Sequence, residues 1–442
     1  MSAPGLIFAA PASGSGKTTL VAGLLRLLNR RGLQISAAKL GPDYIDPAFH
    51  TAASGRPCLN IDLWAMRPAT VTALRERLSG GGALTVVEGA MGLFDGAADG
   101  TASAADFAAL TGWPVILVVD ARGQAQSAGA LLGGFAHHRA DIAIAGVIFN
   151  RIGRPAHESA LRQAAEPLGI PVLGCIPRAA DLVLPERHLG LVQALEHTDL
   201  EAFLDRLADH LEARLDIDRL LDLARPARLP TSAGAAGSLL PLGQRIAVAC
   251  DAAFAFSYAG QLDAWRNSGT EIELFSPLAD EAPPAGCDAV YLPGGYPELH
   301  AGRLASGEHF LHGLRGAAAR GAVLFGECGG YMTLGAGLID KEGRRHAMAG
   351  LLPLESSFAE PHLHLGYRQA ALLAAGPLGA TGASFRGHEF HYATVLDEGE
   401  GEALFDCCDA LGRSLGEVGR RRGKVAGSFI HLIDSRERPQ AR

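Results

Sequence analysis

A short apolar run, Leu6–Ala10, leads directly into a glycine-rich loop that contains a lysine and ends where a helical pattern begins. The loop reads Pro11-Ala-Ser-Gly-Ser-Gly-Lys-Thr-Thr19. Its glycines let successive backbone N–H groups face one anion, and the N-terminus of the following helix adds partial positive charge. A strand that feeds such a loop and helix is typical of a parallel α/β sheet, so this segment constrains the fold strongly.

The same loop predicts a nucleotide site. Lys17 would reach the β- and γ-phosphates, and the Thr18 hydroxyl would ligate Mg²⁺. Pro11 replaces the usual first glycine of such loops, so this is a variant. The alternative, a Gly/Ser-rich turn that contains a lysine by chance, is weakened by the position directly after a first strand. The residues expected to bind ATP are Ser13, Gly14, Ser15, Gly16, Lys17, Thr18, Thr19 and, through a base edge, Asn150.

Further apolar runs of strand length alternate with helical patterns along both halves of the chain. They are rich in Val, Ile and Leu and lack polar alternation, as is typical of buried parallel strands. The first half contains Ser36–Leu40, Leu84–Glu88, Val115–Asp120, Ala143–Asn150 and Val172–Ile176, and the second contains Arg245–Ala249, Glu271–Phe275, Ala289–Leu292 and Ala322–Gly326. We therefore expect an α/β protein with two doubly wound domains.

Between residues 224 and 244 the composition changes to Ala, Gly, Ser and Pro, which is typical of a linker. The sequence thus predicts a nucleotide-binding domain over residues 1–223, a linker over 224–244, and a second domain over 245–442.

Composition excludes several classes of partner. The chain has 47 acidic side chains against 39 Lys plus Arg, a formal net charge of −8, which argues against nonspecific nucleic-acid binding. Its apolar runs are too short to span a bilayer. The seven cysteines include no CxxC pair, so neither a zinc module nor a disulfide framework is indicated. We expect a cytoplasmic protein with reduced thiols and no membrane partner.

Two acidic segments follow predicted strands, where ligands bind in doubly wound sheets. One is Lys39-Leu-Gly-Pro-Asp-Tyr-Ile-Asp-Pro47, and the other is Val86-Val-Glu-Gly-Ala-Met-Gly-Leu-Phe-Asp-Gly96. Mg²⁺ prefers oxygen ligands, so Thr18, Asp43 and Glu88 are the candidate metal set. Asp43 could instead cap a helix and Asp95 could be a turn residue. A functional role is as plausible as a structural one for Asp46 and Asp95.

The second half contains a cysteine between glycines, in Leu324-Phe-Gly-Glu-Cys-Gly-Gly330. An apolar strand, a nucleophile and a helix in this order predict a nucleophile elbow at Cys328, with a thiol pKa lowered by the helix N-terminus. The backbone N–H groups of Gly294, Gly295 and Gly329 could form an oxyanion hole. His431 follows another short apolar strand and is a plausible base for Cys328. A buried core thiol is the weaker alternative because of the flanking glycines.

These motifs carry a family resemblance. Pro293-Gly-Gly-Tyr-Pro-Glu298, Gly326-Glu-Cys-Gly-Gly330 and Ser428-Phe-Ile-His431 resemble a class I glutamine amidotransferase domain, and the N-terminal half resembles dethiobiotin-synthetase-like P-loop proteins. Together with the two acidic segments and Arg386-Gly-His-Glu-Phe-His-Tyr392, they resemble the corrin a,c-diamide synthases.

The resemblance implies a substrate and a reaction. Such enzymes amidate the a and c acetates of hydrogenobyrinic or cobyrinic acid in cobalamin synthesis, with ATP, Mg²⁺ and glutamine. ATP would phosphorylate a carboxylate, and Cys328 would release ammonia from glutamine to displace the phosphate. Tyr44, Asp46 and Asp95 would bind the substrate, and a homodimer is possible.

One position departs from the wider amidotransferase pattern. Most class I amidotransferases have a Glu two residues after the catalytic His, but this chain has Ile433 at that position. The corrin-amidating branch similarly lacks this Glu. What orients His431 is left open, and a Cys–His dyad is the working assumption. The segment with His388, Glu389 and His391 could suggest a metal site. Strand alternation would separate His388 from the other two side chains, so hydrogen bonding and packing are preferred.

Three other acceptors and one alternative from another class are kept open. The acceptor could be cob(II)yrinic acid, as in an anaerobic route, or nickel-sirohydrochlorin, or the later amidations of cobyric acid synthesis. The Ala-, Gly- and Arg-rich composition slightly favours metal-free hydrogenobyrinic acid. A nucleotide-switch scaffold with an inactive amidotransferase domain is the alternative from another class, and the Cys328–His431 pair argues against it.

Overall fold

The computed structural model describes residues 3–80, 83–184, 186–187, 190–228 and 239–436. The chain divides into two compact units. The first comprises Met1–Trp64 and Val71–Gly234, and the second comprises Ala65–Thr70 and Ala235–Arg442. Within the predicted linker, Arg225–Pro226 (β10) pairs with the first strand, while residues 229–238 lie outside the described residues. Among the described residues, no helix is both long and apolar enough to cross a membrane.

The first unit is built on a parallel sheet with strand order β3-β2-β4-β1-β5-β6-β7, and β10 is added antiparallel to β1. The strands are β1 (Pro4–Ala9), β2 (Ile35–Leu40), β3 (Leu59–Ile61), β4 (Leu84–Glu88), β5 (Val115–Asp120), β6 (Ile144–Ile152) and β7 (Val172–Pro177). Most of their side chains are buried, as the continuous apolar runs predicted. The short strand β3 was not predicted, because three residues are too few to show a period.

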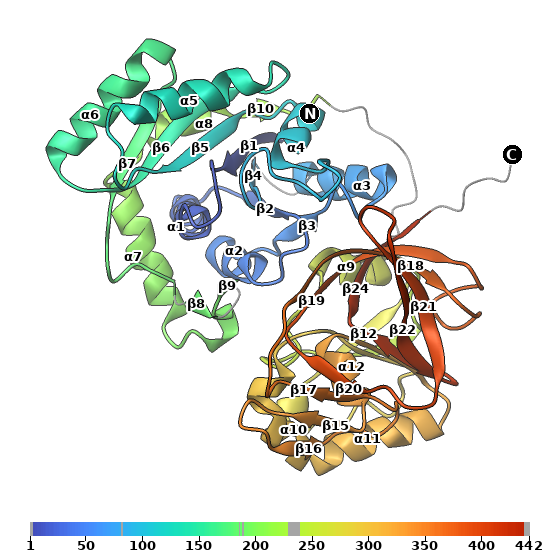
Figure 1. Ribbon diagram of the computed structural model, residues 1–442. Coiled ribbons are helices and arrows are strands. Elements are labelled where there is room, and N and C mark those ends of the chain that lie inside the picture. The colour runs from blue at the N-terminus through green and yellow to red at the C-terminus, as the bar shows by residue number, and fades with distance from the viewer. Residues whose placement is uncertain (1–2, 81–82, 185, 188–189, 229–238, 437–442) are drawn as a thin grey trace, which may run out of the picture. The chain divides into compact units, whose positions relative to one another are not determined.

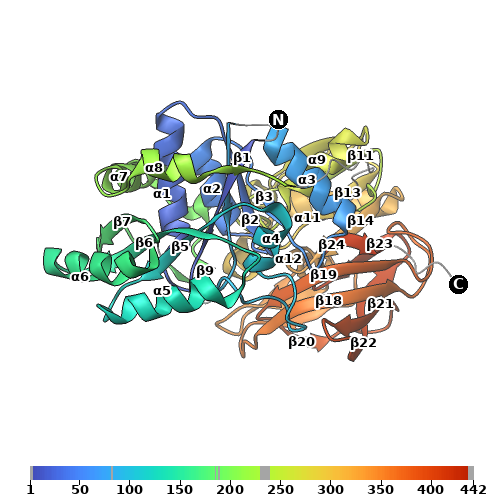
Figure 2. The same cartoon turned by 90° about the horizontal axis from the view of Figure 1, so that it is seen from above.

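Helices cover both faces of this sheet. In Figure 2, α1, α2 and α7 lie on one side of the strands and α5 and α6 on the other. The helices are α1 (Lys17–Arg30), α2 (Asp46–Ser54), α3 (Pro68–Gly80), α4 (Ala104–Thr111), α5 (Ser127–His138), α6 (Pro155–Ala165), α7 (Leu200–Glu212) and α8 (Ile217–Leu223). The unit also contains the short pair β8 (Glu186–Arg187) and β9 (Gly190–Leu191). The predicted α/β class is thus confirmed in this half.

Strand order places the acidic segments beside the glycine-rich loop. β1 lies between β4 and β5, and β4 also pairs with β2. Glu88, the last residue of β4, is in register with Phe8 of β1 and with Lys39 of β2. Because these strands are parallel, their carboxyl ends meet at one edge of the sheet.

The second unit contains a ten-stranded sheet in which a parallel half continues into an antiparallel half (Figure 1). The parallel strands are β12 (Glu271–Phe275), β11 (Arg245–Ala249), β13 (Ala289–Leu292), β14 (Val323–Glu327) and β23 (Val425–Ser428). The antiparallel strands are β22 (Ser414–Arg422), β21 (Glu402–Asp409), β18 (His364–Leu372), β19 (Ser384–His391) and β24 (Ile430–Arg436). The apolar runs predicted most of the parallel strands but not the antiparallel half, whose strands mix polar and apolar residues.

Two apolar cores lie on opposite faces of this sheet. One includes Phe310 and Leu314 from α11 (Glu308–Ala319), and the other includes Trp265 from α9 (Ala259–Asn267). The other helices are α10 (Ala301–Ser306) and α12 (Gly329–Leu334). A separate small sheet contains β16 (Arg345–Ala347), β15 (Gly337–Ile339), β17 (Glu355–Ser357) and β20 (Thr394–Asp397).

Candidate active sites

The glycine-rich loop joins β1 to α1. Gly14 and Gly16 have positive φ values of 74° and 83°, which L side chains rarely adopt. Gly16 forms the N-cap of α1, and the Ser15 hydroxyl donates to the Ala12 carbonyl at 2.8 Å. The loop therefore turns sharply and directs the N-terminus of a 14-residue helix toward its concave side.

Lys17 is almost buried at the start of α1. Its ammonium donates to the Met91 carbonyl at 2.6 Å, in the segment that follows β4. Burial lowers the pKa of Lys17, although the nearby Glu88 opposes this change. The side chain thus lies across the loop toward the acidic strand ends, where an anion could replace its carbonyl partner.

An acidic cluster gathers beside Thr18. The Thr18 hydroxyl oxygen lies 2.9 Å from Asp46 Oδ2 and 2.9 Å from Glu88 Oε1. The buried Lys39 ammonium contacts the same two oxygens, at 2.5 and 2.7 Å. Asp43 Oδ2 lies farther from the ammonium, at 3.8 Å. The structure therefore brings Thr18 and Glu88 together. Asp46 belongs to the same group, because it contacts both Thr18 and the Lys39 ammonium, whereas Asp43 lies farther from that ammonium.

Ion pairing decides the charges in this cluster. Burial alone would lower the pKa of Lys39, but Asp46 and Glu88 outweigh it and hold that pKa well above its usual value. Burial likewise opposes ionisation of Glu88, yet Lys39 and His50 keep the pKa of Glu88 low. Burial and the charge of Asp43 raise the pKa of Asp46 to about 6.

Lys39 and His50 were missed by the sequence analysis. His50 is fully buried, and its Nε2 lies 2.5 Å from Glu88 Oε2. Asp46 and His50 stand four residues apart on α2, so they occupy one helix face. That spacing was the available signal for His50. For Lys39 the signal was a lysine inside an apolar strand, since a buried ammonium requires anionic partners.

The other predicted residues of this unit have structural contacts. Asp43 Oδ1 accepts the backbone N–H groups of Ile45 and Asp46, so Asp43 does cap the turn before α2. Asp95 accepts the Gly92 N–H at 3.0 Å. Tyr44 is largely buried, at 9% exposed.

Asn150 supports the glycine-rich loop. Its side-chain amide donates to the Ser15 carbonyl at 3.0 Å, and its side-chain oxygen accepts the Arg151 N–H. Arg151 donates to the Gly14 carbonyl at 2.6 Å and pairs with Asp120 at 2.7 Å. In this structure both residues, near the carboxyl end of β6, therefore hold the loop in shape.

Cys328 stands between β14 and α12 with φ 49° and ψ −104°, a strained conformation for a residue with a side chain. The glycines on either side are required because other backbone atoms lie where their Cβ atoms would be. A Cβ on Gly330 would lie 1.9 Å from the Leu292 carbonyl oxygen, and one on Gly326 would lie 2.6 Å from the Gly330 carbonyl carbon. The strand, sharp turn and helix expected of a nucleophile elbow are all present.

His431 and Gly294 adjoin Cys328. A Cβ on Gly294 would lie 2.2 Å from His431 Cε1, 3.0 Å from His431 Nε2 and 3.2 Å from Cys328 Cβ. Similarly, a Cβ on Gly329 would lie 3.2 Å from the Gly295 nitrogen. The cysteine, the histidine and the three predicted oxyanion-hole glycines therefore gather at one place.

The expected low pKa of the Cys328 thiol is not found. Burial raises that pKa well above its usual value, and the hydrogen bond from the Gly329 N–H only partly opposes the change. Burial, together with His388 and His391, lowers the pKa of His431 to about 3. At neutral pH the resting pair is therefore a neutral thiol and a neutral imidazole.

Near Cys328, the His-Glu-His cluster formed by His364, Glu389 and His391 places its possible ligand atoms within 4.8 Å of one another. Glu389 pairs with Arg368 at 2.6 Å and with His391 at 2.9 Å. The rings of His364 and His391 are stacked, with centroids 4.6 Å apart and an angle of 13° between planes. Stacked rings direct their in-plane lone pairs side by side, so this geometry favours packing and ion pairing over metal ligation.

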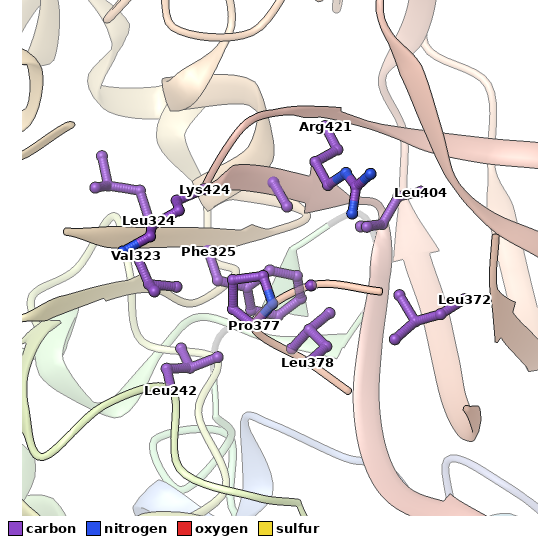
Figure 3. A pocket seen from close by; sticks show the side chains of 12 residues that line it. Leu242, Val323, Leu324, Phe325, Leu372, Pro377, Leu378, Leu404, Arg421 and Lys424 are labelled. Atoms are coloured by element: carbon purple, nitrogen blue, oxygen red, sulfur yellow. The ribbon is translucent and has the colours of Figure 1, made fainter. Parts of the chain in front are cut away.

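An apolar pocket of the second unit lies elsewhere (Figure 3). Its walls include Leu242, Pro377 and Leu378, together with Val323 and Phe325 of β14. Cys328 follows the carboxyl end of β14, whereas Val323 begins the strand. The pocket therefore extends from the opposite end of the strand that carries the candidate nucleophile.

Two known families match this chain. Residues 6–192 match the CobQ/CobB/MinD/ParA nucleotide binding domain, and residues 245–438 match the CobB/CobQ-like glutamine amidotransferase domain. These matches confirm the order of domain types that the motifs predicted.

Curated relatives match almost the whole chain. The hydrogenobyrinate a,c-diamide synthase of Brucella anthropi is 55% identical over 432 residues, which cover 97% of this chain and 98% of that protein. The proteins of the same name from Rhizobium meliloti and Rhodobacter capsulatus are 54% and 52% identical, and the matches cover 98% and 97% of this chain and 100% and 98% of theirs. With both domain families present and more than half of the residues identical over nearly the full length, this chain belongs to the hydrogenobyrinate a,c-diamide synthase family.

Proposed function

We propose that this protein amidates the a and c acetate carboxylates of hydrogenobyrinic acid, with ATP as the activating nucleotide and glutamine as the nitrogen donor. The observation that carries the proposal is the 55% identity to a hydrogenobyrinate a,c-diamide synthase over 97% of the chain. The two candidate sites supply the two half-reactions that such a synthase needs, activation of a carboxylate and release of ammonia.

The first half-reaction belongs to the glycine-rich loop. The phosphates of ATP would lie against the backbone N–H groups from Ser13 to Gly16 and against Lys17, with Thr19 beside them. A substrate carboxylate oxygen attacks the γ-phosphorus, the bond to the β-phosphate oxygen breaks, and ADP leaves. The product is an acyl phosphate. Asn150 would contact the base in addition to supporting the loop.

The acidic cluster fits Mg²⁺, because a cation already lies among its oxygens. The Lys39 ammonium contacts Asp46 and Glu88 and lies 3.8 Å from Asp43. Thr18, Asp43 and Glu88 would hold the metal, which when bound supplies charge neutralisation at the β- and γ-phosphates. Asp46 borders this set, and with Tyr44 and Asp95 it would contact the corrinoid.

The second half-reaction belongs to Cys328. Its sulfur attacks the side-chain amide carbon of glutamine, while His431 accepts the thiol proton. The backbone N–H groups of Gly294, Gly295 and Gly329 would stabilise the oxyanion. His431 then gives the proton to the leaving nitrogen, so that ammonia departs and a thioester remains, which water hydrolyses to glutamate. Ammonia attacks the acyl phosphate, and phosphate leaves as the amide forms.

The proposal is tested with MgATP, glutamine and a panel of tetrapyrroles, with ADP release and product mass as readouts. Conversion of one or two acids to amides on hydrogenobyrinic acid supports it. Turnover of only cobyrinic acid or nickel-sirohydrochlorin would keep the chemistry and replace the acceptor. ATP hydrolysis with no tetrapyrrole product and no glutaminase activity would instead support the nucleotide-switch alternative.

We also propose a homodimer and a cytoplasmic location, both from the family resemblance and composition. Sedimentation of the purified chain and fractionation of cells test these two points directly.

A further inference from the structure

A histidine that accepts a proton from cysteine needs a partner that fixes its ring orientation. In this chain the residue two positions after His431 is the apolar Ile433, buried and without an acidic group. The neighbourhood of the His431 ring therefore has to provide any carboxylate that orients it.

Glu327 places a carboxylate beside the His431 ring. It ends β14, directly before Cys328, and is 3% exposed. Its Oε2 lies 4.0 Å from His431 Nδ1. Its Oε1 accepts the Leu432 N–H at 3.0 Å, and its Oε2 accepts the Tyr291 hydroxyl at 2.7 Å. Two donors from β24 and β13 thus fix the carboxylate beside the imidazole.

The ring orientation gives each nitrogen a separate direction. The Cε1 and Nε2 atoms of His431 are those closest to the Gly294 position, which also adjoins Cys328. Nδ1 is the atom that approaches Glu327. The imidazole thus has Nε2 on the side of Cys328 and Nδ1 on the side of Glu327, as in a catalytic triad, with the carboxylate 4.0 Å away and just beyond hydrogen-bond distance.

Glu389 also acts on His431 and raises its pKa, but the partners of its two oxygens are Arg368 and His391, whereas those of Glu327 are a neutral hydroxyl and a backbone N–H. Oε2 contacts Arg368 at 2.6 Å, and Oε1 contacts His391 at 2.9 Å. These contacts make Glu389 the acid of a separate ion-paired group.

We propose that Glu327 is the positioning residue of His431, so that the glutaminase site is a Cys328–His431–Glu327 triad whose acid precedes the nucleophile in the chain. This inference rests on the proposed function, because it requires Cys328 and His431 to hydrolyse glutamine. The carboxylate orients the neutral imidazole and stabilises the imidazolium that forms when the thiol loses its proton.

The electrostatic surroundings are consistent with this role. Burial raises the pKa of Glu327 to about 7, against the hydrogen bonds from Tyr291 and Leu432, so the carboxylate ionises near neutral pH. His388, His391 and Glu389 act on His431 from the side of β19, and Tyr291 acts on Glu327 from β13. The charge of Glu389 opposes the effect of the two histidines. An ionised Glu327 at 4.0 Å from Nδ1 would favour the imidazolium in the same way.

The test uses the full chain with Glu327→Gln, which keeps the side-chain shape and removes the charge. We expect glutaminase kcat to fall about 100-fold, within the range for general base catalysis, while the KM for glutamine is preserved. The low-pH limb of glutaminase kcat, which in the wild type follows the ionisation of Glu327, should disappear in the variant, because no acid then titrates beside His431. A role limited to folding would leave that pH profile unchanged.

Two further variants make the outcome decisive. Tyr291→Phe removes one donor to Glu327, so the carboxylate ionises at higher pH and the low-pH limb of glutaminase activity moves up. This variant decides the question if Glu327→Gln does not fold. The matched control is Glu398→Gln, which removes a carboxylate that also accepts a tyrosine hydroxyl, from Tyr331 at 3.1 Å. It should retain wild-type glutaminase activity.

Unchanged kcat and pH profiles in folded Glu327→Gln, or in Tyr291→Phe if the first variant does not fold, would overturn the triad. Failure of the proposed function looks different, because the wild type would then hydrolyse no glutamine, or hydrolysis would persist in Cys328→Ala, and the Glu327 variants would have no glutaminase site to disturb.

Discussion

The two candidate sites hold their reactive groups in opposite ways. In the first unit, buried charges fix one another, since Lys39 lies between the carboxylates of Asp46 and Glu88. In the second, Cys328 and His431 are neutral at rest and are held by close packing around Gly294. Phosphoryl transfer needs countercharges in place before the anions arrive, whereas a neutral thiol becomes nucleophilic only when a base accepts its proton.

This contrast predicts which changes each site tolerates. Removing one charge should harm the nucleotide site, because the partner is then buried alone. Adding one methyl group to a glycine should harm the glutaminase site, because neighbouring atoms approach the backbone there more closely than a side chain would allow. Each site can also be tested separately, since free ammonium bypasses glutamine hydrolysis but not carboxylate activation.

The largest effect is expected for Cys328→Ala. Without the thiolate, glutamine-dependent amidation should fall by about 10⁴-fold or more, while amidation with ammonium chloride should persist. Product mass with each nitrogen source measures both rates. Loss of both activities in a folded variant would mean that Cys328 has a structural role.

Lys17→Ala should produce the complementary pattern. Removing the ammonium that would face the β- and γ-phosphates should lower amidation about 10³-fold with either nitrogen source. The internal control is glutamine hydrolysis, which should remain measurable. Normal turnover at saturating ATP would contradict the assignment of the loop to ATP binding.

Continuous motifs explain why much of both sites could be predicted from the sequence. The glycine-rich loop and the Gly326–Gly330 segment each contain their strand, turn and helix start within a few neighbouring residues. Glu88 could be predicted because a carboxylate that ends an apolar strand is costly without a partner. The parallel strands followed from their apolar runs in the same way.

The remaining features depend on contacts between distant segments. Lys39, His50 and Glu327 acquire their partners only when separate strands and helices come together. A local pattern, such as a lysine inside an apolar strand, can mark such a residue but cannot identify its partner. The pKa of Cys328 was predicted in the wrong direction because burial outweighs the effect of the Gly329 N–H, and burial of a single side chain is not visible in the sequence. The antiparallel strands lacked a clear apolar period.

Gly294→Ala tests the steric side of the comparison. The added methyl group would lie 2.2 Å from His431 Cε1, so the imidazole must move away from Cys328. We expect glutamine hydrolysis to fall about 100-fold, because a displaced base loses most of its catalytic contribution. Ammonium-dependent amidation should be unaffected. The control is Gly134→Ala on α5, because the space around its Cβ position is open. Gly321→Ala at an exposed turn is unsuitable, because that glycine has a φ of 82°.

The smallest expected effect concerns stability, and it tests whether the glutaminase site contains an ionisable acid of its own. The folded pKa of Glu327, about 7, is above its ordinary value of 4.5, so the folded protein retains this proton in the pH range between them. The resulting stabilisation is complete below pH 4.5 and is lost as the pH rises through 7. His431, whose folded pKa is about 3 instead of 6.5, changes the unfolding free energy with pH in the opposite direction. This contribution is the same in the wild type and in Glu327→Gln.

Relative to Glu327→Gln, the wild type should therefore lose about 2 kcal/mol of unfolding free energy between about pH 5.5 and 7.5. Urea unfolding followed by tryptophan fluorescence at several pH values measures this difference. Parallel curves for the two proteins would mean that Glu327 does not titrate in this range, and the buried acid beside His431 would then have to be ionised throughout.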